Sequence, residues 1–341
     1  MRKTALIVLA LLIVTVCTLG AFGTAGMRQN GMESPGASSA SGPSVSTAPP
    51  PAPESSSDEP GAEHSSEPEP DPEPEPAPET LATLSFVGDC MTATQDGGHG
   101  KGSYNWYAQN YPASYFFERV SSVLQADDLT IANCEAVLSD RPLEKRVKSS
   151  GKNYWYIGPA SNAAIFAAGG VEFAGFANNH TLDYGDEGYN DTIAALKANG
   201  LAVGAHGQTL YKTVNGVKIG IYFGNLCGTI TDIAAAQTQR QWDVRLQTHV
   251  EKYARRIDAM QEDCDVRILY FHGGEMYADV PEDAKVALLR GIAEASSVDV
   301  IVGCHSHNLQ PYEVYAGKTI LYSLGNFTYG GKKKPPKETQ A

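Results

Sequence analysis

The sequence predicts an α/β domain whose strands form a mixed sheet or a two-sheet sandwich covered by helices. From residue 81 onward, short apolar runs alternate with longer amphipathic stretches, which is the pattern of strands joined by helices. Two segments read instead as hairpins: 201–225, with Asn215 and Gly216 at the turn, and the stretch that begins at Glu313. Hairpins argue against a purely parallel sheet, so we expect parallel and antiparallel strands together.

Five apolar runs are the expected strands, and each is followed by a polar side chain that can bind a metal ion. These runs are LATLSFVG before Asp89, DLTIANC before Glu135, VEFAGFA before Asn178, Asn179 and His180, VRILYF before His272, and VDVIVGC before His305 and His307. Helices are expected over 115–125, 160–168, 188–197, 248–260 and 281–295, the last with Pro281, Glu282 and Asp283 in its first turn. Because open α/β sheets bind ligands at the carboxyl ends of their strands, these polar residues are expected at one edge.

Residues 1–30 have the composition of a targeting segment. Arg2 and Lys3 precede an apolar run from Ala5 to Val16. Export follows from this pattern, while an uncleaved anchor, cleavage of a signal peptide and lipidation at Cys17 stay open as alternatives. The domain is therefore expected on the extracytoplasmic side of the cell membrane, anchored by its N-terminus, or secreted if the signal is cleaved.

Residues 31–80 read as a disordered linker rich in Pro, Glu and Ser. They hold thirteen of the twenty prolines and eleven acidic residues, with no Lys or Arg. Such a segment cannot bury enough apolar surface to offset its ordering entropy, and Pro-Glu alternation favours an extended spacer. The folded domain is expected over 81–331, and a basic flexible tail over 332–341.

The charge and the cysteines argue against two classes of protein. The net charge is −13, but the linker carries most of it, so the domain is mildly acidic and shows no basic cluster for nucleic acid. Of the six cysteines, Cys17 lies in the targeting segment, and a fold stapled by disulfides is not expected from the five that remain. The absence of a CxxC pair disfavours a thiolate zinc site.

The polar residues after the strands fit a metal site. A dinuclear hydrolytic site needs hard oxygen ligands together with imidazoles, and often one carboxylate shared by two ions. His305-Ser306-His307 is an H-x-H pair, which on an extended backbone would put both imidazoles on the same face. A single histidine is more often a satisfied polar residue, but several at strand ends beside Asp and Glu predict one or two divalent ions. Mn, Zn and Fe are candidates.

Several segments carry a family resemblance: SFVGDCM, IANCEAVLSD, FANNHTLDYGDEGYNDTIAAL, YFHGGEMY and VGCHSHNLQPYEVYAGKTILYSLGNF. In this order they resemble the signatures of the CapA capsule-synthesis family, also called the poly-γ-glutamate capsule proteins. The resemblance runs from about Leu84 to Phe327. It implies the four-layer fold of the calcineurin-like metallophosphatase superfamily, in which mixed sheets form a sandwich flanked by helices.

The resemblance also implies roles for individual residues. It implies metal binding by Asp89, by Glu135 as the bridging acid, and by Asn179, His272, His305 and His307, with His180 as the catalytic imidazole and Asp183 orienting it. One departure concerns the first motif, because general metallophosphatases begin with Asp-x-His and this chain has Cys90 and Met91 after the aspartate. The first ion therefore loses an imidazole, and Cys90 is not expected to replace it, since neighbouring strand residues point to opposite faces.

Two functions are compatible with this pattern. One is a metal-dependent hydrolase that acts outside the membrane on a phosphoester, or on an amide or ester link of an anionic surface polymer. The other is a non-catalytic component that binds or anchors the polymer in a capsule export machine. Retention of His180 favours chemistry, whereas the missing first-motif histidine favours binding.

In both cases the resemblance implies capsule or poly-γ-glutamate biosynthesis. The implied partners are an anionic polymer such as poly-γ-glutamate and other membrane components of a capsule synthesis complex. The basic residues Lys145, Arg146, Lys148 and Lys152 either line a groove for a polyanion or form a solvated loop.

Overall fold

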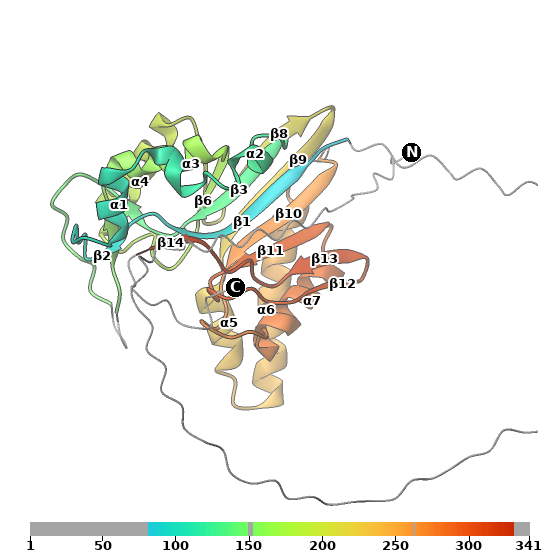
Figure 1. The fold of residues 1–341 in the computed structure, drawn as a ribbon. Helices are drawn as coiled ribbons and strands as arrows, with labels where there is room; N and C mark the ends of the chain where they lie inside the picture. The colour runs from blue at the N-terminus through green and yellow to red at the C-terminus, as the bar shows by residue number, and fades with distance from the viewer. Residues whose placement is uncertain (1–80, 149–152, 261, 263, 331–341) are drawn as a thin grey trace, which may run out of the picture. The chain divides into compact units, whose positions relative to one another are not determined.

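The structure, a computed structural model, describes residues 81–148, 153–260, 262 and 264–330. The expected targeting segment, linker and basic tail lie outside these residues. Within the described part of the chain, no helix is both long enough and apolar enough to cross a membrane. The described residues form two main sheets with helices packed on them (Figure 1).

One main sheet is parallel throughout, with the strand order β14-β1-β3-β6-β7. Its strands are β1 (Leu84–Met91), β3 (Leu129–Cys134), β6 (Phe173–Phe176), β7 (Ala202–Ala205) and β14 (Asn326–Tyr329). Every residue of β3 is buried, which is typical of a parallel strand covered on both faces.

The second main sheet is mixed, with the order β12-β13-β11-β10-β9-β8. Its strands are β8 (Thr209–Val214), β9 (Val217–Asn225), β10 (Val266–His272), β11 (Val300–Cys304), β12 (Tyr312–Tyr315) and β13 (Lys318–Leu321). The antiparallel hairpins β8–β9 and β12–β13 lie at its two edges. The second confirms the hairpin expected from Glu313, whereas the first covers only 209–225 of the expected 201–225, because 202–205 form β7 of the parallel sheet. A small third sheet consists of β2 (Thr94–Gln95), β4 (Val137–Leu138) and β5 (Tyr156–Gly158).

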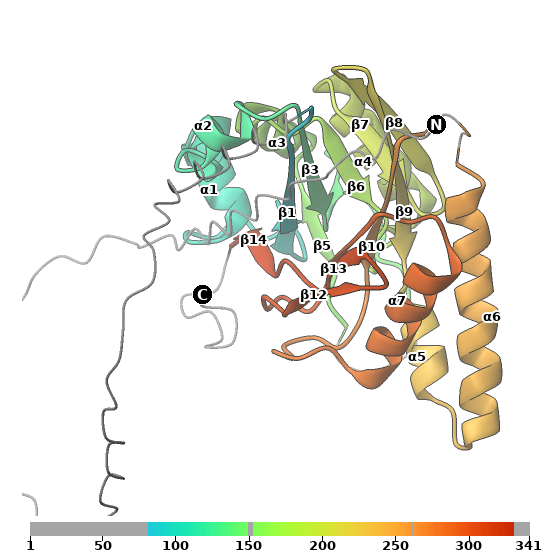
Figure 2. The same ribbon diagram turned by 90° about the vertical axis from the view of Figure 1, so that its right-hand side faces the viewer.

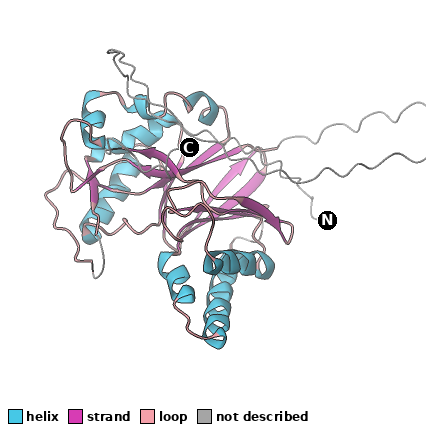
Figure 3. Ribbon diagram, turned by 60° about the horizontal axis from the view of Figure 1, so that its bottom comes forward, coloured by secondary structure: helices cyan, strands magenta, loops and turns pink. Residues whose placement is uncertain are grey.

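Helices cover the outer face of each main sheet, so the domain has four layers (Figure 2, Figure 3). The parallel sheet is covered by α1 (Tyr104–Asn110), η1 (Ala113–Phe116), α2 (Ser121–Leu124), η2 (Ala160–Ala163), α3 (Ala164–Gly169) and α4 (Gly185–Ala198). The mixed sheet is covered by α5 (Cys227–Ala234), α6 (Gln239–Asp258) and α7 (Asp283–Ala295). Between the sheets, Ile131 and Phe173 pack with Phe223 and Ile268. The predicted α/β sandwich flanked by helices is confirmed.

The structure corrects several expected helices. The helix expected over 115–125 is split into η1 and α2, and the Ser121 hydroxyl donates to the Glu118 carbonyl at 3.4 Å, a side-chain bond that competes with helix formation. Helix α6 begins at Gln239, nine residues earlier than expected, because the Thr238 hydroxyl caps its first turn. Helices α1 and α5 were not expected from the sequence.

The strand register positions the functional residues. In the parallel sheet, Asp89 of β1 pairs with Asn133 of β3 and with Asn326 of β14. In the mixed sheet, His272 at the end of β10 pairs with Cys304 at the end of β11. Because parallel neighbours end at the same level, the polar residues at these strand ends gather at one place.

Candidate metal centre

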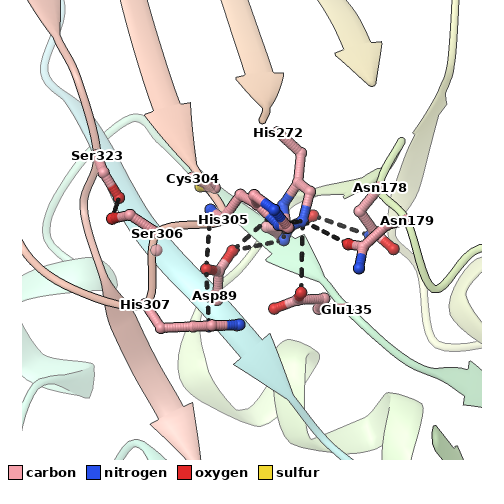
Figure 4. Close-up of polar contacts among 12 residues, drawn as sticks. Asp89, Glu135, Asn178, Asn179, His272, Cys304, His305, Ser306, His307 and Ser323 are labelled. Atoms are coloured by element: carbon pink, nitrogen blue, oxygen red, sulfur yellow. Dashed lines mark hydrogen bonds and ion pairs between the residues drawn. The ribbon is translucent and has the colours of Figure 1, made fainter. Parts of the chain in front are cut away.

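Asp89 lies at the centre of a buried polar cluster (Figure 4). Its Oδ1 accepts a hydrogen bond from Asn133 Nδ2 at 2.7 Å, and its Oδ2 accepts one from the His305 backbone N–H at 3.0 Å. The Nδ1 atoms of His272 and His307 each lie 3.5 Å from one of its carboxylate oxygens. The aspartate therefore contacts residues from both main sheets.

Glu135 faces the same cluster without a hydrogen-bond donor. Its side chain is fully buried, and neither carboxylate oxygen has a hydrogen bond among the described residues. Its nearest charged neighbour is His272, whose Nε2 lies 3.4 Å from Oε1. A buried carboxylate is costly unless it is paired or coordinates a metal ion, so these two oxygens fit the role of a metal ligand.

Three polar atoms lie around the Nε2 atom of His272. His272 Nε2 lies 2.7 Å from Asn179 Oδ1 and 2.8 Å from His305 Nδ1, in addition to its contact with Glu135. One N–H cannot serve three acceptors at once, whereas a single cation can accept a lone pair from each. The geometry thus suits a cation better than a hydrogen-bonded network.

The backbone after β11 differs from the extended H-x-H pair that the sequence suggested. His305 and His307 have φ angles of 97° and 60°, so both lie in the left-handed region rather than on an extended strand. Their rings are 6.1 Å apart between centroids, and they point to different donor groups: His305 toward His272, and His307 toward Asp89. Both imidazoles belong to the cluster, as expected, but the expected extended backbone that was to place them on one face is not observed.

The donor atoms fall into two groups. In each group all ligand atoms lie within 4.8 Å of one another: Asp89, Glu135 and His307 in the first, and Cys227, His272 and His305 in the second. All six sequence-predicted ligands therefore lie together, with Asn179 joined to the second group through its bond to His272. Their assignment as metal ligands stays a prediction.

Cys227 is the member that the sequence reasoning missed. It opens α5, two residues after β9 ends, and its thiol donates to the His272 carbonyl at 3.7 Å. Its position after an apolar run, IGIYFGN, is the same signal that identified the other candidates, but that run was interpreted only as half of a hairpin. The prediction against a thiolate site rested on CxxC spacing, which says nothing about a cysteine brought in by a parallel neighbour.

Two asparagines that were given no role from the sequence, Asn133 and Asn326, also contact the candidate ligands. Asn133 contacts Asp89, lies 3.1 Å from His272 Nδ1 through its Nδ2, and accepts a bond from Asn178 Nδ2 at 3.1 Å. Asn326 Oδ1 lies 2.9 Å from His307 Nδ1. These contacts fix the orientation of the ligands, as outer partners do in metal sites.

The pKa shifts of the candidate ligands differ in their effect on metal binding. Burial, and then the charges of Glu135 and Asp89, raise the pKa of the Cys227 thiol to about 12, so this thiol is protonated until a metal ion displaces its proton. Burial raises the pKa of Asp89, but hydrogen bonds from His272 and His307 outweigh it and hold this pKa well below its usual value. Burial lowers the pKa of His307, yet the Glu135 and Asp89 carboxylates raise it to about 9. Burial, and then the charges of the other two imidazoles, hold the pKa of His305 well below its usual value. His305 is thus a neutral lone-pair donor, whereas His307 carries a proton that a metal ion would displace.

His180 and Asp183 form a buried pair beside the cluster. His180 Nδ1 lies 2.8 Å from Asp183 Oδ2, which also accepts the Tyr156 backbone N–H at 2.9 Å, and Lys148 Nζ is 2.5 Å from Asp183 Oδ1. The Tyr156 ring packs edge-on against the imidazole, with centroids 4.9 Å apart. The structure therefore shows an oriented imidazole next to Asn179 in the chain, and its catalytic role stays a prediction.

Cys90 lies outside the cluster. Its thiol contacts the Gly88 carbonyl at 3.6 Å and is buried in the core beneath α1–α4. Burial, the largest effect, raises the pKa of this thiol well above its usual value, so it stays protonated. The five described cysteines, which include Cys90, are all free.

Comparisons with known proteins identify the family. Residues 83–330 match the family model described as bacterial capsule synthesis protein PGA_cap. The chain is 30% identical over 260 residues to the capsule biosynthesis protein CapA of Bacillus anthracis, which covers 72% of this chain and 59% of that protein. It is 27% identical over 262 residues to the PGA biosynthesis protein CapA of Bacillus subtilis, with coverages of 74% and 64%.

The chain thus spans less than two thirds of the length of these curated relatives, 59% and 64%. A crystal structure of a hypothetical protein from Thermus thermophilus aligns with a TM-score of 0.40 and 13% identity, over 71% of this chain and 75% of that one. Because the family model covers nearly the whole described domain, the chain belongs to the PGA_cap family of bacterial capsule synthesis proteins.

Proposed function

We propose that this protein acts in the synthesis or export of a capsule polymer such as poly-γ-glutamate, as a metal-dependent, hydrolase-like enzyme on the extracytoplasmic side of the membrane. The observation that carries the proposal is Glu135. Its fully buried carboxylate has no hydrogen-bond donor among the described residues, yet it lies beside Asp89 and the imidazoles of His272 and His307. Such a residue is costly in a binding module and useful in a metal centre.

The donor set decides which ions fit. Carboxylate, amide and imidazole donors suit Mn, Fe or Zn, and the thiol of Cys227 adds a soft donor to the second group. Asp89, Glu135 and His307 would hold one ion, and Asn179, His272, His305 and Cys227 the other. When bound, such ions supply Lewis-acid chemistry to a phosphoryl or carbonyl oxygen.

The residues around the metal groups have separate tasks in this proposal. Asp183 holds the His180 imidazole through Nδ1, which leaves Nε2 as the nitrogen that can carry a proton to a leaving oxygen or nitrogen. Asn133 and Asn326 keep Asp89 and His307 in place. Burial of the cluster excludes water and strengthens each electrostatic contact.

Location and partners follow from sequence and family. The targeting pattern of residues 1–30 supports an exported domain that is either anchored or released, with 31–80 as its spacer. Two relatives are named for capsule and PGA biosynthesis, which supports an anionic capsule polymer and membrane components of its synthesis complex as partners.

A non-catalytic role in binding the polymer is the second candidate. It is favoured by Met91, which stands where general metallophosphatases have the histidine of their first motif and is fully buried among apolar side chains and Tyr156. In this alternative the metal groups hold the polymer, and no bond is broken.

Elemental analysis of the purified chain, combined with hydrolysis assays on a phosphodiester and on poly-γ-glutamate, separates these candidates. We expect one or two bound ions per chain, and activity that His180→Ala and His305→Ala each abolish. Because His180 contacts none of the metal groups through a described bond, its variant should keep the metal while losing turnover. A chain that purifies without stoichiometric metal and takes none up refutes the metal centre. Metal-loaded protein whose weak activity survives both substitutions supports the binding role instead.

A further inference from the structure

A groove leads away from the metal cluster on the side of Asn179. It is a cavity of about 700 Å³ between the start of α4, the end of β9 and the face of α6, and its lining includes Arg146, Asn179, Asn225 and Lys252. Its volume is within the roughly 300–1,000 Å³ of small-molecule sites. Asn179 belongs to both features, since its Oδ1 bonds His272 while the residue itself is exposed. We call this cavity the Asn179 groove.

Two cations of the Asn179 groove have no anionic partner. Neither the Arg146 guanidinium nor the Lys252 ammonium forms an ion pair with any residue that the structure describes, and Lys252 Nζ only lies over the ring of Tyr253 at 5.1 Å. The acid in the lining is Asp186, on the first turn of α4. Unpaired cations that face a cavity are available to an anionic ligand.

One imidazole of the groove, His206, lies close enough to Lys252 to be affected by its charge. Burial lowers the pKa of His206, and the charges of Lys252 and Arg256 lower it further. His206 accepts the Asn225 backbone N–H through Nδ1 at 2.9 Å, so it is held against the end of β9. His249 differs, because its Nε2 lies 3.0 Å from Asp232 and is already partnered.

We propose that the Asn179 groove binds a carboxylate-bearing segment of the capsule polymer, with Arg146 and Lys252 on its free α-carboxylates, and leads the polymer to the metal cluster. This inference rests on the proposed function, because it takes the polymer from there. The groove connects that polymer with the cluster, because its lining includes both cations and Asn179, whose amide oxygen contacts His272. A polymer with one free carboxylate per residue meets both cations in turn, and Arg can bind a carboxylate through two parallel hydrogen bonds.

The groove also accounts for the basic run next to β5. Of that run, Lys145 pairs with Asp96 at 2.6 Å and Lys148 with Asp183, so both are satisfied within the domain. Arg146 alone among the three described members lines the cavity. The run is therefore divided between structural ion pairs and one cation directed to a ligand.

The test uses the full, metal-loaded chain and a fluorescent γ-linked glutamate oligomer, with affinity measured by anisotropy at low salt. Lys252→Glu and Arg146→Glu are each expected to weaken binding roughly fivefold or more, since each turns an attraction into a repulsion. Lys101→Glu and Arg119→Glu are matched controls, because both residues are exposed and outside the groove lining, and they should leave the affinity unchanged. Raising the salt to about 0.5 M should erase the difference.

The experiment distinguishes failure of the groove proposal from failure of the proposed hydrolase function. No measurable binding by the unaltered chain, equal affinity of the lining and control variants, or equal binding of an uncharged γ-linked oligomer whose α-carboxylates are converted to amides overturns the groove proposal. Metal content and hydrolysis, measured on the same samples, report on the metal centre separately. If the protein binds the oligomer through Lys252 and Arg146 but does not cleave it, the groove proposal is supported and the hydrolase proposal is refuted. Unchanged thermal melting of each variant shows that the fold is intact.

Discussion

The affinity of the first donor group for a metal ion should depend steeply on pH. A metal ion binds the neutral imidazole, and the pKa of His307 is about 9 although burial alone would lower it. The Glu135 and Asp89 carboxylates cause this rise, and they are also the other two donors of the group. At neutral pH the ion must therefore displace a proton that its own co-ligands hold in place.

The magnitude follows from the distance between pH and pKa. At pH 7, which is two units below the pKa, removing the proton costs about 2.7 kcal/mol, or roughly a hundredfold in apparent affinity. Affinity should rise about tenfold per pH unit up to about pH 9 and then level off. His272, whose pKa is also raised by Glu135 and Asp89 against the effect of burial, changes the affinity of the second group in the same direction.

Calorimetry of Mn²⁺ binding in two buffers of different ionisation enthalpy measures the protons released. We expect about one proton released per chain from His307 at pH 7, with further contributions from His272 and from the Cys227 thiol when the second ion binds. Glu135→Gln should weaken binding and flatten its pH dependence, because it removes both a ligand and the largest cause of the raised His307 pKa. An affinity that is constant between pH 6 and pH 8, or binding with no proton release, would falsify this account.

Three further changes test the fold and the site. Gly303→Ala would place a Cβ 2.1 Å from the Tyr322 carbonyl oxygen, and should lower the free energy of unfolding by about 1–3 kcal/mol in urea titrations. Burial lowers the pKa of Lys285 to about 8, so its charge destabilises the fold below pH 8 and this cost fades toward pH 10.5; Lys285→Met should therefore stabilise the protein by roughly 2 kcal/mol at pH 7 and by less at pH 10. Asp183→Asn should reduce turnover and alter its pH profile without lowering metal content, because Asp183 orients His180 and its side-chain partners, His180, Tyr156 and Lys148, lie outside the two donor groups.

The sequence predicted which polar residues gather at the strand ends better than it predicted their surroundings, because apolar strand patterns can be recognised in a sequence and loop conformations cannot. Asp89, Glu135 and His272 each follow an apolar run, and parallel strands bring such ends to one edge whatever their separation in the chain. Asn133 is different, since it lies inside a strand run and becomes functional only through the register that pairs it with Asp89.

The missed elements have a common physical cause. The first half of α6, QRQWDVRLQ, has few apolar residues, and it is helical because an N-cap and side-chain bonds such as Gln239 to Asp243 at 2.7 Å support an exposed face. Periodicity of apolar residues cannot detect a helix of this kind. Likewise, the positive φ angles of His305 and His307 are imposed by tertiary contacts, so strand geometry could not predict where their rings point.

Because the histidine of the first motif is absent, the two donor groups differ in their number of protein donors. Met91 occupies its place and packs with Tyr156 and Tyr329, so the group of Asp89, Glu135 and His307 has three protein donors. The group around His272 has more, since Asn179 and a thiol join the imidazoles there. Three protein donors with an open position are typical of catalytic metal sites, and a full set is typical of structural ones. The unequal pair is therefore consistent with one ion that holds the site together and one that is open to substrate.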